Sequence, residues 1–321
     1  MTSAPPPSPR AVAIMGPTAA GKARLGREAA LRLSLPVLVC DSVKVYRGLD
    51  IGSAKPTAAE RAEVRHELLD LVDPDAPFSA GDYARLAWTH LGGGRGLFVG
   101  GTGFYLRAVA FTSSAGVEGQ EDALDAPERR AFEAQWDARE HDDPGAAHRA
   151  LHAVDPETAR AIHPHNVVRS LRALWLCERT GGPISAARAS DPPRLRLSLM
   201  LVVLDPDPDA WHERMVRRVD RMLAHGFLDE VEKLRRAGYH ARHKAMRSLG
   251  YRQLWEVVEG RSTLPQAREA IIAATRQYAR RQRTYLRTQL AAALPAAAVV
   301  AVRSPAACPW GQIQAFVDAT P

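Results

Sequence analysis

The chain of 321 residues has few cysteines and lacks any long apolar run. Its three cysteines, Cys40, Cys177 and Cys308, lie far apart in the sequence, so they indicate neither a disulfide framework nor a zinc cluster. No apolar stretch approaches the roughly 20 residues that a membrane-spanning helix needs. The first ten residues, MTSAPPPSPR, contain no apolar core of the signal-peptide kind. We therefore expect a cytoplasmic protein without a membrane partner, and a free N-terminal tail over residues 1–10.

Acidic residues are fewer than basic ones, since the chain has 36 aspartates and glutamates but 43 lysines and arginines. The resulting net charge of +7 favours a polyanionic partner, although many basic enzymes bind no nucleic acid. The placement of the arginines must therefore decide whether the chain binds a nucleic acid. With 46% hydrophobic residues, the chain can build one large or two modest cores.

Short apolar runs are spaced along the chain, and each ends in a polar or glycine-rich turn. They are AVAIM (11–15), LPVLVC (35–40), GLFVG (96–100) and LSLMLVVLD (197–205). Runs of this kind, separated by helical stretches, are typical of buried parallel strands. Because ligands gather at the carboxyl ends of such strands, we expect Gly16, Asp41 and the Gly100–Thr102 turn to lie side by side.

A long stretch without strand signals separates the third run from the fourth. It begins with a polar segment at 113–126, continues with helical segments at 127–140, 144–160 and 165–179, and ends in a proline-containing linker. We predict an α/β fold in which a P-loop-type parallel sheet is flanked by helices, over 11–114 and 194–321. An all-helical insertion occupies 115–193, and residues 211–290 are again helical.

The stretch GPTAAGKA at 16–23 matches the phosphate-binding pattern G-x-x-x-x-G-K-[ST] except at its last letter. A predicted strand precedes it and a predicted helix over 22–33 follows it, which disfavours a chance glycine turn. Backbone N–H groups from Gly16 to Gly21, together with Lys22, would surround two adjacent phosphates. Ala23 lacks the hydroxyl that usually binds magnesium. A metal ion must then be held by water, by Asp41, by other side chains or by the phosphates themselves.

Two further polar residues follow predicted strands. Asp41 can take a proton from a nucleophile or steady a metal ion, but an aspartate that merely caps a turn fits the local pattern equally well. The hydroxyl of Thr102 can reach a phosphate, and a simple turn threonine is again the alternative.

The arginines form two groups. Arg276, Arg280, Arg283 and Arg287 fall on one face of a predicted helix, and residues 276–290 contain no acid. Such a face suits phosphate contacts, to a substrate or to a nucleic acid backbone, better than a solvated face paired with acids. Arg214, Arg217, Arg218 and Arg221 form the second group, which Glu213 and Asp220 partly offset.

Several motifs together resemble the tRNA dimethylallyltransferases (tRNA isopentenyltransferases). In order they are GPTAAGK, DSVKVYRGLDIGSAKP, HELLDLVDPDAPFSAGDY, VGGTGFYLRA, IHPHNVVRSLRAL, MLAHGFLDEV, SLGYRQLWEVVEG and TRQYARRQRTYLR, over residues 11–290. The resemblance implies transfer of a dimethylallyl group from dimethylallyl diphosphate to the exocyclic amine of an adenine. That adenine lies just 3′ of the anticodon in tRNAs that read codons beginning with U. The implied partners are the tRNA anticodon stem-loop and the prenyl diphosphate, with Mg²⁺ as cofactor, and the protein is expected to be a monomer.

The resemblance also assigns roles to residues. It implies that Asp41 accepts the proton of the adenine amine, and that Thr18, Lys22, Thr102 and Arg218 surround the diphosphate. The diphosphate loop comprises Gly16, Pro17, Thr18, Ala19, Ala20, Gly21, Lys22 and Ala23. The expected tRNA contacts are Asp41, Ser42, Val43, Lys44, Thr102, Arg130, Val168, Arg169, Ser170, Leu171, Arg172, Arg247, Ser248, Leu249, Gly250, Tyr251 and Arg252, and to these the arginine face adds Arg276, Arg280 and Arg283.

The chain departs from the family pattern at a few positions. Ala23 stands in place of Ser or Thr, and Lys44 in place of the glutamine in DS-x-Q-V-Y. His165 and Asn166 stand in place of Asn-Asp, and Trp175 in place of the glutamate in RALE. Two other hypotheses therefore stay open: a phosphotransferase of the nucleotide-kinase type, and a tRNA-binding homologue that has lost its chemistry.

Overall fold

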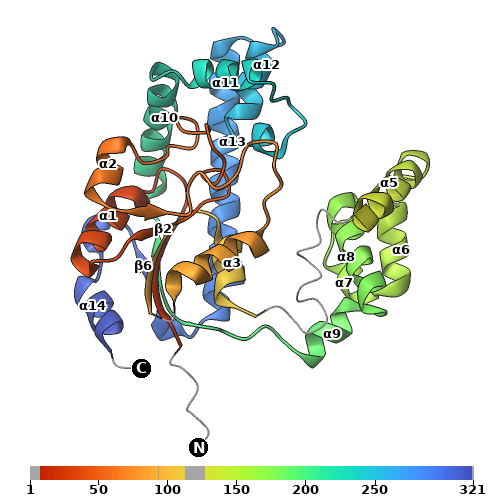
Figure 1. Cartoon of the computed structure of the whole chain (residues 1–321), viewed down its shortest axis with the longest axis horizontal. Coiled ribbons are helices and arrows are strands. Elements are labelled where there is room, and N and C mark those ends of the chain that lie inside the picture. The colour runs from red at the N-terminus through yellow and green to blue at the C-terminus, as the bar shows by residue number, and fades with distance from the viewer. Residues whose placement is uncertain (1–7, 93, 113–126, 320–321) are drawn as a thin grey trace, which may run out of the picture. The chain divides into compact units, whose positions relative to one another are not determined.

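A parallel sheet organises the larger part of the molecule (Figure 1). The computed structural model describes residues 8–92, 94–112 and 127–319. Within these residues the sheet has six strands in the order β3-β2-β4-β1-β5-β6, and every neighbouring pair is parallel. The strands are β1 (Arg10–Met15), β2 (Val37–Cys40), β3 (His66–Glu67), β4 (Arg95–Gly100), β5 (Ser198–Leu204) and β6 (Val299–Val302). The predicted α/β class and its four apolar strands are confirmed, whereas β3 and β6 were not predicted.

Helices cover both faces of this sheet, and Figure 1 shows α1 and α14 on one side and α3 on the other. The helices of this unit are α1 (Lys22–Leu33), α2 (Ala58–Glu63), α3 (Ala80–Leu91), α4 (Gly103–Ala110), α10 (Pro208–Ala224), α11 (Phe227–Arg236), α12 (Tyr251–Val258), α13 (Leu264–Tyr285) and α14 (Trp310–Asp318). Alternate strand residues such as Val12, Ile14 and Val99 pack with α1 and α14 in one core, which is why the strands are apolar throughout.

Capping residues set the ends of several helices. The side chain of Ser79 accepts the backbone N–H of Asp82 at the start of α3, and Thr263 does the same for Gln266 at the start of α13. The predicted helical stretch 211–290 is correct in kind, but it divides into separate helices. One break lies at Gly226, whose φ of +92° precedes α11.

The chain divides into two compact units. One comprises the described residues up to Ala110 and from Arg196 onward, and the other runs from Phe111 to Leu195. The sequence analysis had placed these boundaries after residues 114 and 193. The second unit is helical, with α5 (Pro127–Asp142), α6 (Ala146–Val154), α7 (Pro156–Arg160), α8 (Val167–Thr180) and α9 (Ile184–Ser190) around its own apolar core.

Some predictions fall on segments at the edge of what the structure describes. The expected polar segment 113–126 lies outside the described residues, as does the expected tail as far as residue 7. The tail was predicted too long, because Arg10 begins β1 and its backbone N–H donates to the Gly94 carbonyl at 3.0 Å. None of the helices in the described ranges is both long and apolar enough to cross a membrane.

Candidate active site

The carboxyl ends of β1, β2 and β4 meet at one edge of the sheet, as predicted. Because β4 lies between β1 and β2, the turn that follows Gly100 separates the loop at Gly16 from Asp41. The backbone N–H groups of Gly101 and Thr102 donate to the Cys40 carbonyl at 3.1 and 3.2 Å. A side chain at Gly100 would meet that carbonyl oxygen at 1.8 Å, so only glycine permits this close approach.

The loop after β1 leads directly into the N-terminus of α1. Gly21, with φ of +98°, makes the left-handed turn that starts the helix at Lys22. The methyl group of Ala20 is buried in the core, so this residue can offer a ligand only its backbone. The N-terminus of α1 presents free N–H groups and a positive dipole end, an arrangement that favours phosphate binding.

Two side chains from distant helices hold this loop. The Gln282 amide of α13 bridges the loop and the β4 turn, because its Oε1 accepts Thr18 N–H at 3.0 Å and its Nε2 donates to the Gly101 carbonyl at 2.9 Å. The indole Nε1 of Trp211, on α10, donates to the Thr18 carbonyl at 2.8 Å. The sequence analysis missed both contacts, since no local pattern links residues so far apart.

Asp41 has one oxygen engaged and one that faces the cavity. Its Oδ1 accepts the backbone N–H groups of Val43 and Lys44, at 2.9 and 3.4 Å. Within the described residues, no donor bonds to its Oδ2. Thr102 supports this turn, because its Oγ1 accepts the backbone N–H of Ser42 at 3.1 Å. Thr102 does not itself line the cavity described next, and its expected place beside the diphosphate stays a prediction.

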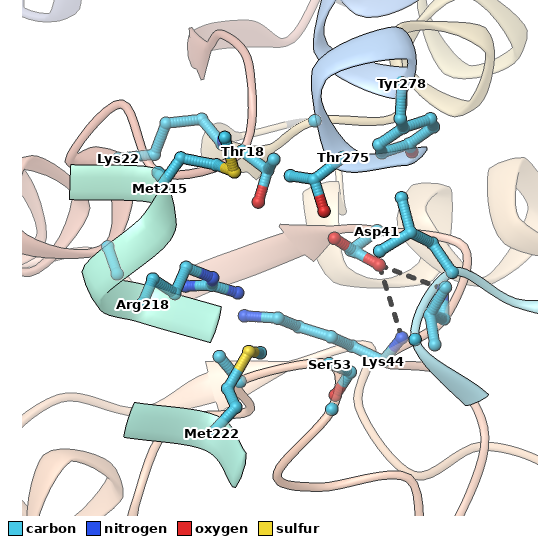
Figure 2. Close-up of a pocket in the computed structure, with 18 of the residues that line it drawn as sticks. Thr18, Lys22, Asp41, Lys44, Ser53, Met215, Arg218, Met222, Thr275 and Tyr278 are labelled. Carbon is cyan, nitrogen blue, oxygen red and sulfur yellow. Dashed lines mark hydrogen bonds between the residues drawn. The ribbon is translucent and has the colours of Figure 1, made fainter. Parts of the chain in front are cut away.

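A cavity of about 230 Å³ opens in front of the strand ends (Figure 2). Figure 2 shows Lys22 and Arg218 on the side of it away from Asp41, and the Lys44 side chain running across it toward Arg218. Apolar side chains form part of the wall, among them Met215, Val219, Met222, Leu249 and Ile271. The cavity therefore combines a cationic end with an apolar wall.

Burial shapes the charge of this cavity. Burial, together with the Arg218 charge and against the opposing Asp41 charge, lowers the pKa of Lys22 to about 7. Burial likewise lowers the pKa of Lys44 to about 8, against the opposing effect of Asp41. The Lys22 amine donates to the Pro17 carbonyl at 2.7 Å. An anionic ligand would relieve the repulsion among these groups.

The described residues around this cavity offer a magnesium ion few protein ligands. Ala23 lines the cavity without a hydroxyl, and Asp41 already uses one carboxylate oxygen for two backbone groups. In the part of the chain that the structure describes, no three His, Cys, Asp or Glu side chains gather as metal ligands would.

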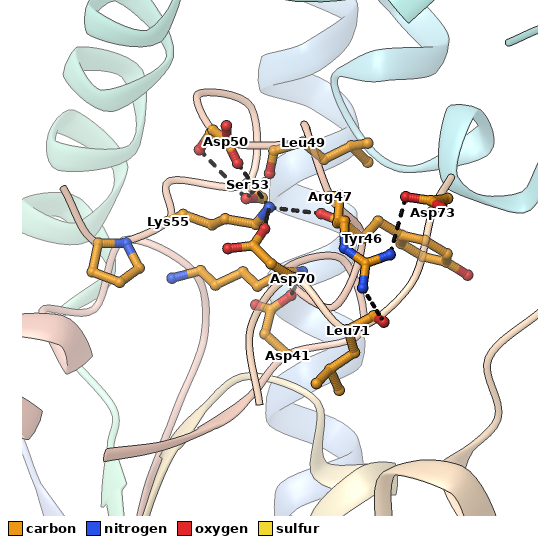
Figure 3. Close-up of polar contacts among 12 residues, drawn as sticks. Asp41, Tyr46, Arg47, Leu49, Asp50, Ser53, Lys55, Asp70, Leu71 and Asp73 are labelled. Carbon is orange, nitrogen blue, oxygen red and sulfur yellow. Dashed lines mark hydrogen bonds and ion pairs between the residues drawn. The ribbon is translucent and has the colours of Figure 1, made fainter. Parts of the chain in front are cut away.

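The DIGSAKP loop, residues 50–56, forms another side of the cavity. A cationic side chain, Lys55, and an anionic one, Glu230, hold it in place. The buried ammonium of Lys55 donates to the Tyr46 carbonyl at 2.6 Å and pairs with Asp50 and Asp70 (Figure 3). The Glu230 carboxylate of α11 accepts three consecutive backbone N–H groups, those of residues 50–52, at 2.7 to 3.1 Å. These contacts fix the loop that carries Ser53 and Ala54 into the cavity wall.

Thr275 and Tyr278 of α13 also line the cavity, and the sequence analysis did not select them as site residues. They share a helical face with Ile271 and Gln282, so the spacing of four, three and four residues is the signal that could have found them. Burial raises the pKa of the Tyr278 phenol to about 12, so it stays protonated beside Asp41.

The residues expected to contact tRNA divide by exposure. Val168, Arg169, Arg247 and Arg252 are exposed, and Leu249 and Gly250 line the cavity. Other members point inward: Ser170 and Leu171 are buried, and the fully buried Tyr251 donates its hydroxyl to Glu230 at 2.7 Å. The side chains of these three pack inside their own units, and their contact with tRNA stays a prediction. Arg130 lies in α5 and Arg172 in α8.

The arginine face of α13 is less free of acids than its own sequence indicated. Arg283 is half-buried, donates to Asp205 Oδ1 at 2.9 Å and lies over the Trp211 ring, so it supports the phosphate loop rather than an exposed tRNA surface. Arg276 and Arg280 are exposed but line a second cavity together with Asp209 and Glu213 of α10. The sequence argument counted only acids within 276–290, whereas the fold brings these acids from elsewhere.

Comparisons with known proteins agree on one family. The family model described as IPP transferase matches residues 44–289, and that described as isopentenyl transferase matches residues 9–75. A tRNA dimethylallyltransferase of Alkalilimnicola ehrlichii is 42% identical over 291 residues, which cover 88% of this chain and 89% of that protein.

Solved structures show the same likeness. The tRNA isopentenylpyrophosphate transferase of Bacillus halodurans is 31% identical, with a TM-score of 0.63 over 96% of this chain and 94% of its own. A eukaryotic dimethylallyltransferase acting on tRNA shares the fold, with a TM-score of 0.77 at 22% identity over 92% of this chain and 74% of its own.

Proposed function

Because this chain belongs to the tRNA dimethylallyltransferase family, we propose that its cavity brings dimethylallyl diphosphate and the target adenine of a tRNA together. The protein is a prenyltransferase that modifies tRNA. The observation that carries the proposal is the position of Asp41 opposite Lys22 and Arg218, with an apolar wall beside them. The apolar wall suits a five-carbon prenyl group, and the cationic end suits its diphosphate.

In the proposed reaction the amine nitrogen of adenine attacks the first carbon of the dimethylallyl group. The new C–N bond forms as the C–O bond to diphosphate breaks, and the electron pair of that bond leaves with the diphosphate. The N–H groups of the phosphate loop, Lys22 and Arg218 stabilise the charge that develops on the leaving group. Oδ2 of Asp41, which accepts no hydrogen bond from a described residue, takes the proton that the amine loses.

We propose that the adenine is unstacked from the anticodon loop to reach Asp41, as enzymes that act on bases commonly require. The exposed arginines Arg169, Arg247 and Arg252, with Arg276 and Arg280, supply phosphate contacts that position the tRNA. The helical unit 111–195 contributes to recognition of the loop by shape. The enzyme acts as a cytoplasmic monomer in this proposal.

Magnesium is proposed to arrive as a complex with the diphosphate. The protein offers it few oxygens, because Ala23 replaces the hydroxyl residue of the loop pattern. The same substitution disfavours a nucleotide kinase, whose magnesium site uses that hydroxyl.

The test is transfer of label from labelled dimethylallyl diphosphate to an unmodified tRNA that reads codons beginning with U. We expect label in the tRNA, and at least an approximately 100-fold lower rate for Asp41→Asn. A tRNA with guanine in place of the target adenine is the matched control and should stay unlabelled. Binding of tRNA without label would indicate a homologue without chemistry, and ATP turnover would indicate a kinase; either result would overturn the proposal.

A further inference from the structure

Lys44 places a positive charge inside the cavity without a protein partner. Its backbone N–H is anchored on Asp41 Oδ1, and Figure 2 shows its side chain crossing the cavity with the amine directed toward Arg218. Its Nζ makes neither a hydrogen bond nor an ion pair with any residue that the structure describes. Burial lowers the pKa of this amine only to about 8, so the ammonium form prevails at neutral pH.

A lysine with a structural role has protein partners for its ammonium group, as Lys55 in the same unit does. The Lys55 ammonium is enclosed by one carbonyl and two carboxylates, so its charge is satisfied by the protein (Figure 3). Lys44 instead faces other cations, since Lys22 and Arg218 share the cavity with a single carboxylate, that of Asp41. Cations held together in this way are destabilising unless a polyanion binds between them.

The second observation is the missing ligand at Ala23. The loop lacks the hydroxyl that a magnesium ion would use, and among the described residues that line the cavity Asp41 alone carries a carboxylate. Compared with the family pattern, this chain lacks one metal ligand, the hydroxyl at position 23, and has one more cation in the cavity, Lys44 in place of glutamine.

We propose that Lys44 binds the diphosphate directly and supplies part of the positive charge that a protein-held magnesium ion would provide, so that this site keeps measurable affinity for diphosphate when magnesium is removed. The inference rests on the proposed function for the identity of the ligand. An ammonium at hydrogen-bond distance from a phosphate oxygen gives a charge-assisted bond, stronger than the amide of a glutamine at the same position can give.

The test is the dissociation constant of inorganic diphosphate, measured by calorimetry in EDTA and in saturating magnesium. We expect the unchanged protein to bind in EDTA. Lys44→Gln should weaken that binding by about tenfold, and clearly less in magnesium, whereas Lys44→Arg should keep most of it. Lys233→Gln, on the exposed face of α11, removes the same charge elsewhere and should leave the binding unchanged. No effect of Lys44→Gln, or the same loss in both conditions, would overturn the proposal.

Restoring the missing hydroxyl gives an independent test. Ala23→Thr should increase the gain in diphosphate affinity that magnesium brings, and should reduce the cost of Lys44→Gln in magnesium. An unchanged magnesium dependence would contradict the compensation between the two positions. These measurements need no tRNA and no transfer, so their failure is distinguishable from failure of the labelling experiment.

Discussion

Several charged side chains line the same cavity, and their charges interact there. Lys22, Lys44, Asp41 and Arg218 come from three separate segments of the chain, yet the charges of the other three all shift the pKa of Lys22. The sequence identified Lys22 from a motif and Asp41 from its place after a strand. It could not show that the Lys22 amine is buried, because burial depends on which segments close over it.

The pKa of Lys22 makes a prediction about pH. Burial and the neighbouring Arg218 lower it to about 7 in the free protein, while a bound diphosphate raises it by favouring the ammonium. Diphosphate therefore prefers the protonated form, and the contribution of Lys22 to affinity is fully present below pH 7 and declines above it. Between pH 7 and 9 we expect the affinity ratio of the unchanged protein to Lys22→Met to fall, by at most about tenfold per pH unit. A ratio independent of pH would contradict the lowered pKa.

At the scale of elements, α13 connects parts of the site that the sheet alone leaves separate. One face of this helix lines the cavity with Thr275 and Tyr278, and Gln282 bridges the phosphate loop and the β4 turn. The DIGSAKP loop depends in the same way on Glu230 of α11. Motifs that are continuous in sequence are thus held in place by side chains from distant helices.

Gln282→Ala should loosen the phosphate loop. It leaves Thr18 N–H and the Gly101 carbonyl without their partner, so we expect a loss of about 1–3 kcal/mol in the free energy of unfolding and weaker diphosphate binding. Urea unfolding and calorimetry with inorganic diphosphate measure the two effects. Gln277→Ala, at an exposed position of the same helix, is the control. Equal diphosphate affinity in the two variants would show that the bridge does not shape the loop.

Lys55→Met should destabilise the fold rather than alter the chemistry directly. It removes the charge that neutralises Asp50 and Asp70 and the donor to the Tyr46 carbonyl. We expect a loss of about 2–3 kcal/mol in the free energy of unfolding, less than for a fully enclosed ion pair because both carboxylates are partly exposed. Lys233→Met, on the exposed face of α11, should change that free energy by less than about 0.5 kcal/mol. Equal stability of the two variants, by urea unfolding, would contradict the role given to Lys55.

At the scale of the whole molecule, the described residues that line the cavity belong to one of the two units. The α/β unit contains the complete cavity, while the helical unit 111–195 has its own core and contributes no side chain to that cavity among the described residues. The net charge of +7 is consistent with a polyanionic substrate as large as tRNA.

Arginines of both units should contribute to tRNA binding if the proposal is right. Arg169→Ala in α8 and Arg247→Ala in the α/β unit remove exposed charges far from one another in the sequence. Each should weaken tRNA binding and lower the slope of log affinity against log salt by about 0.7–0.9, with no change in diphosphate binding. A loss confined to Arg247→Ala, in a salt titration of binding, would show that Arg169 makes no phosphate contact.

The sequence by itself determined the α/β class, four of the strands, the phosphate loop and the catalytic candidates, because these depend on local apolar runs, glycine turns and motif spacing. It missed β6 and α14, whose short apolar stretches become strand and helix only by packing on β5 and β1. It also could not show that Tyr251 and Ser170 are buried and that Arg283 pairs with Asp205, since helical spacing does not reveal which face a neighbour covers. Only the tertiary structure decided that Gln282, Trp211 and Glu230 hold the site, and that Lys44 enters it unpaired. The physical reason is that burial and long-range hydrogen bonds are set by segments that meet only in the folded chain.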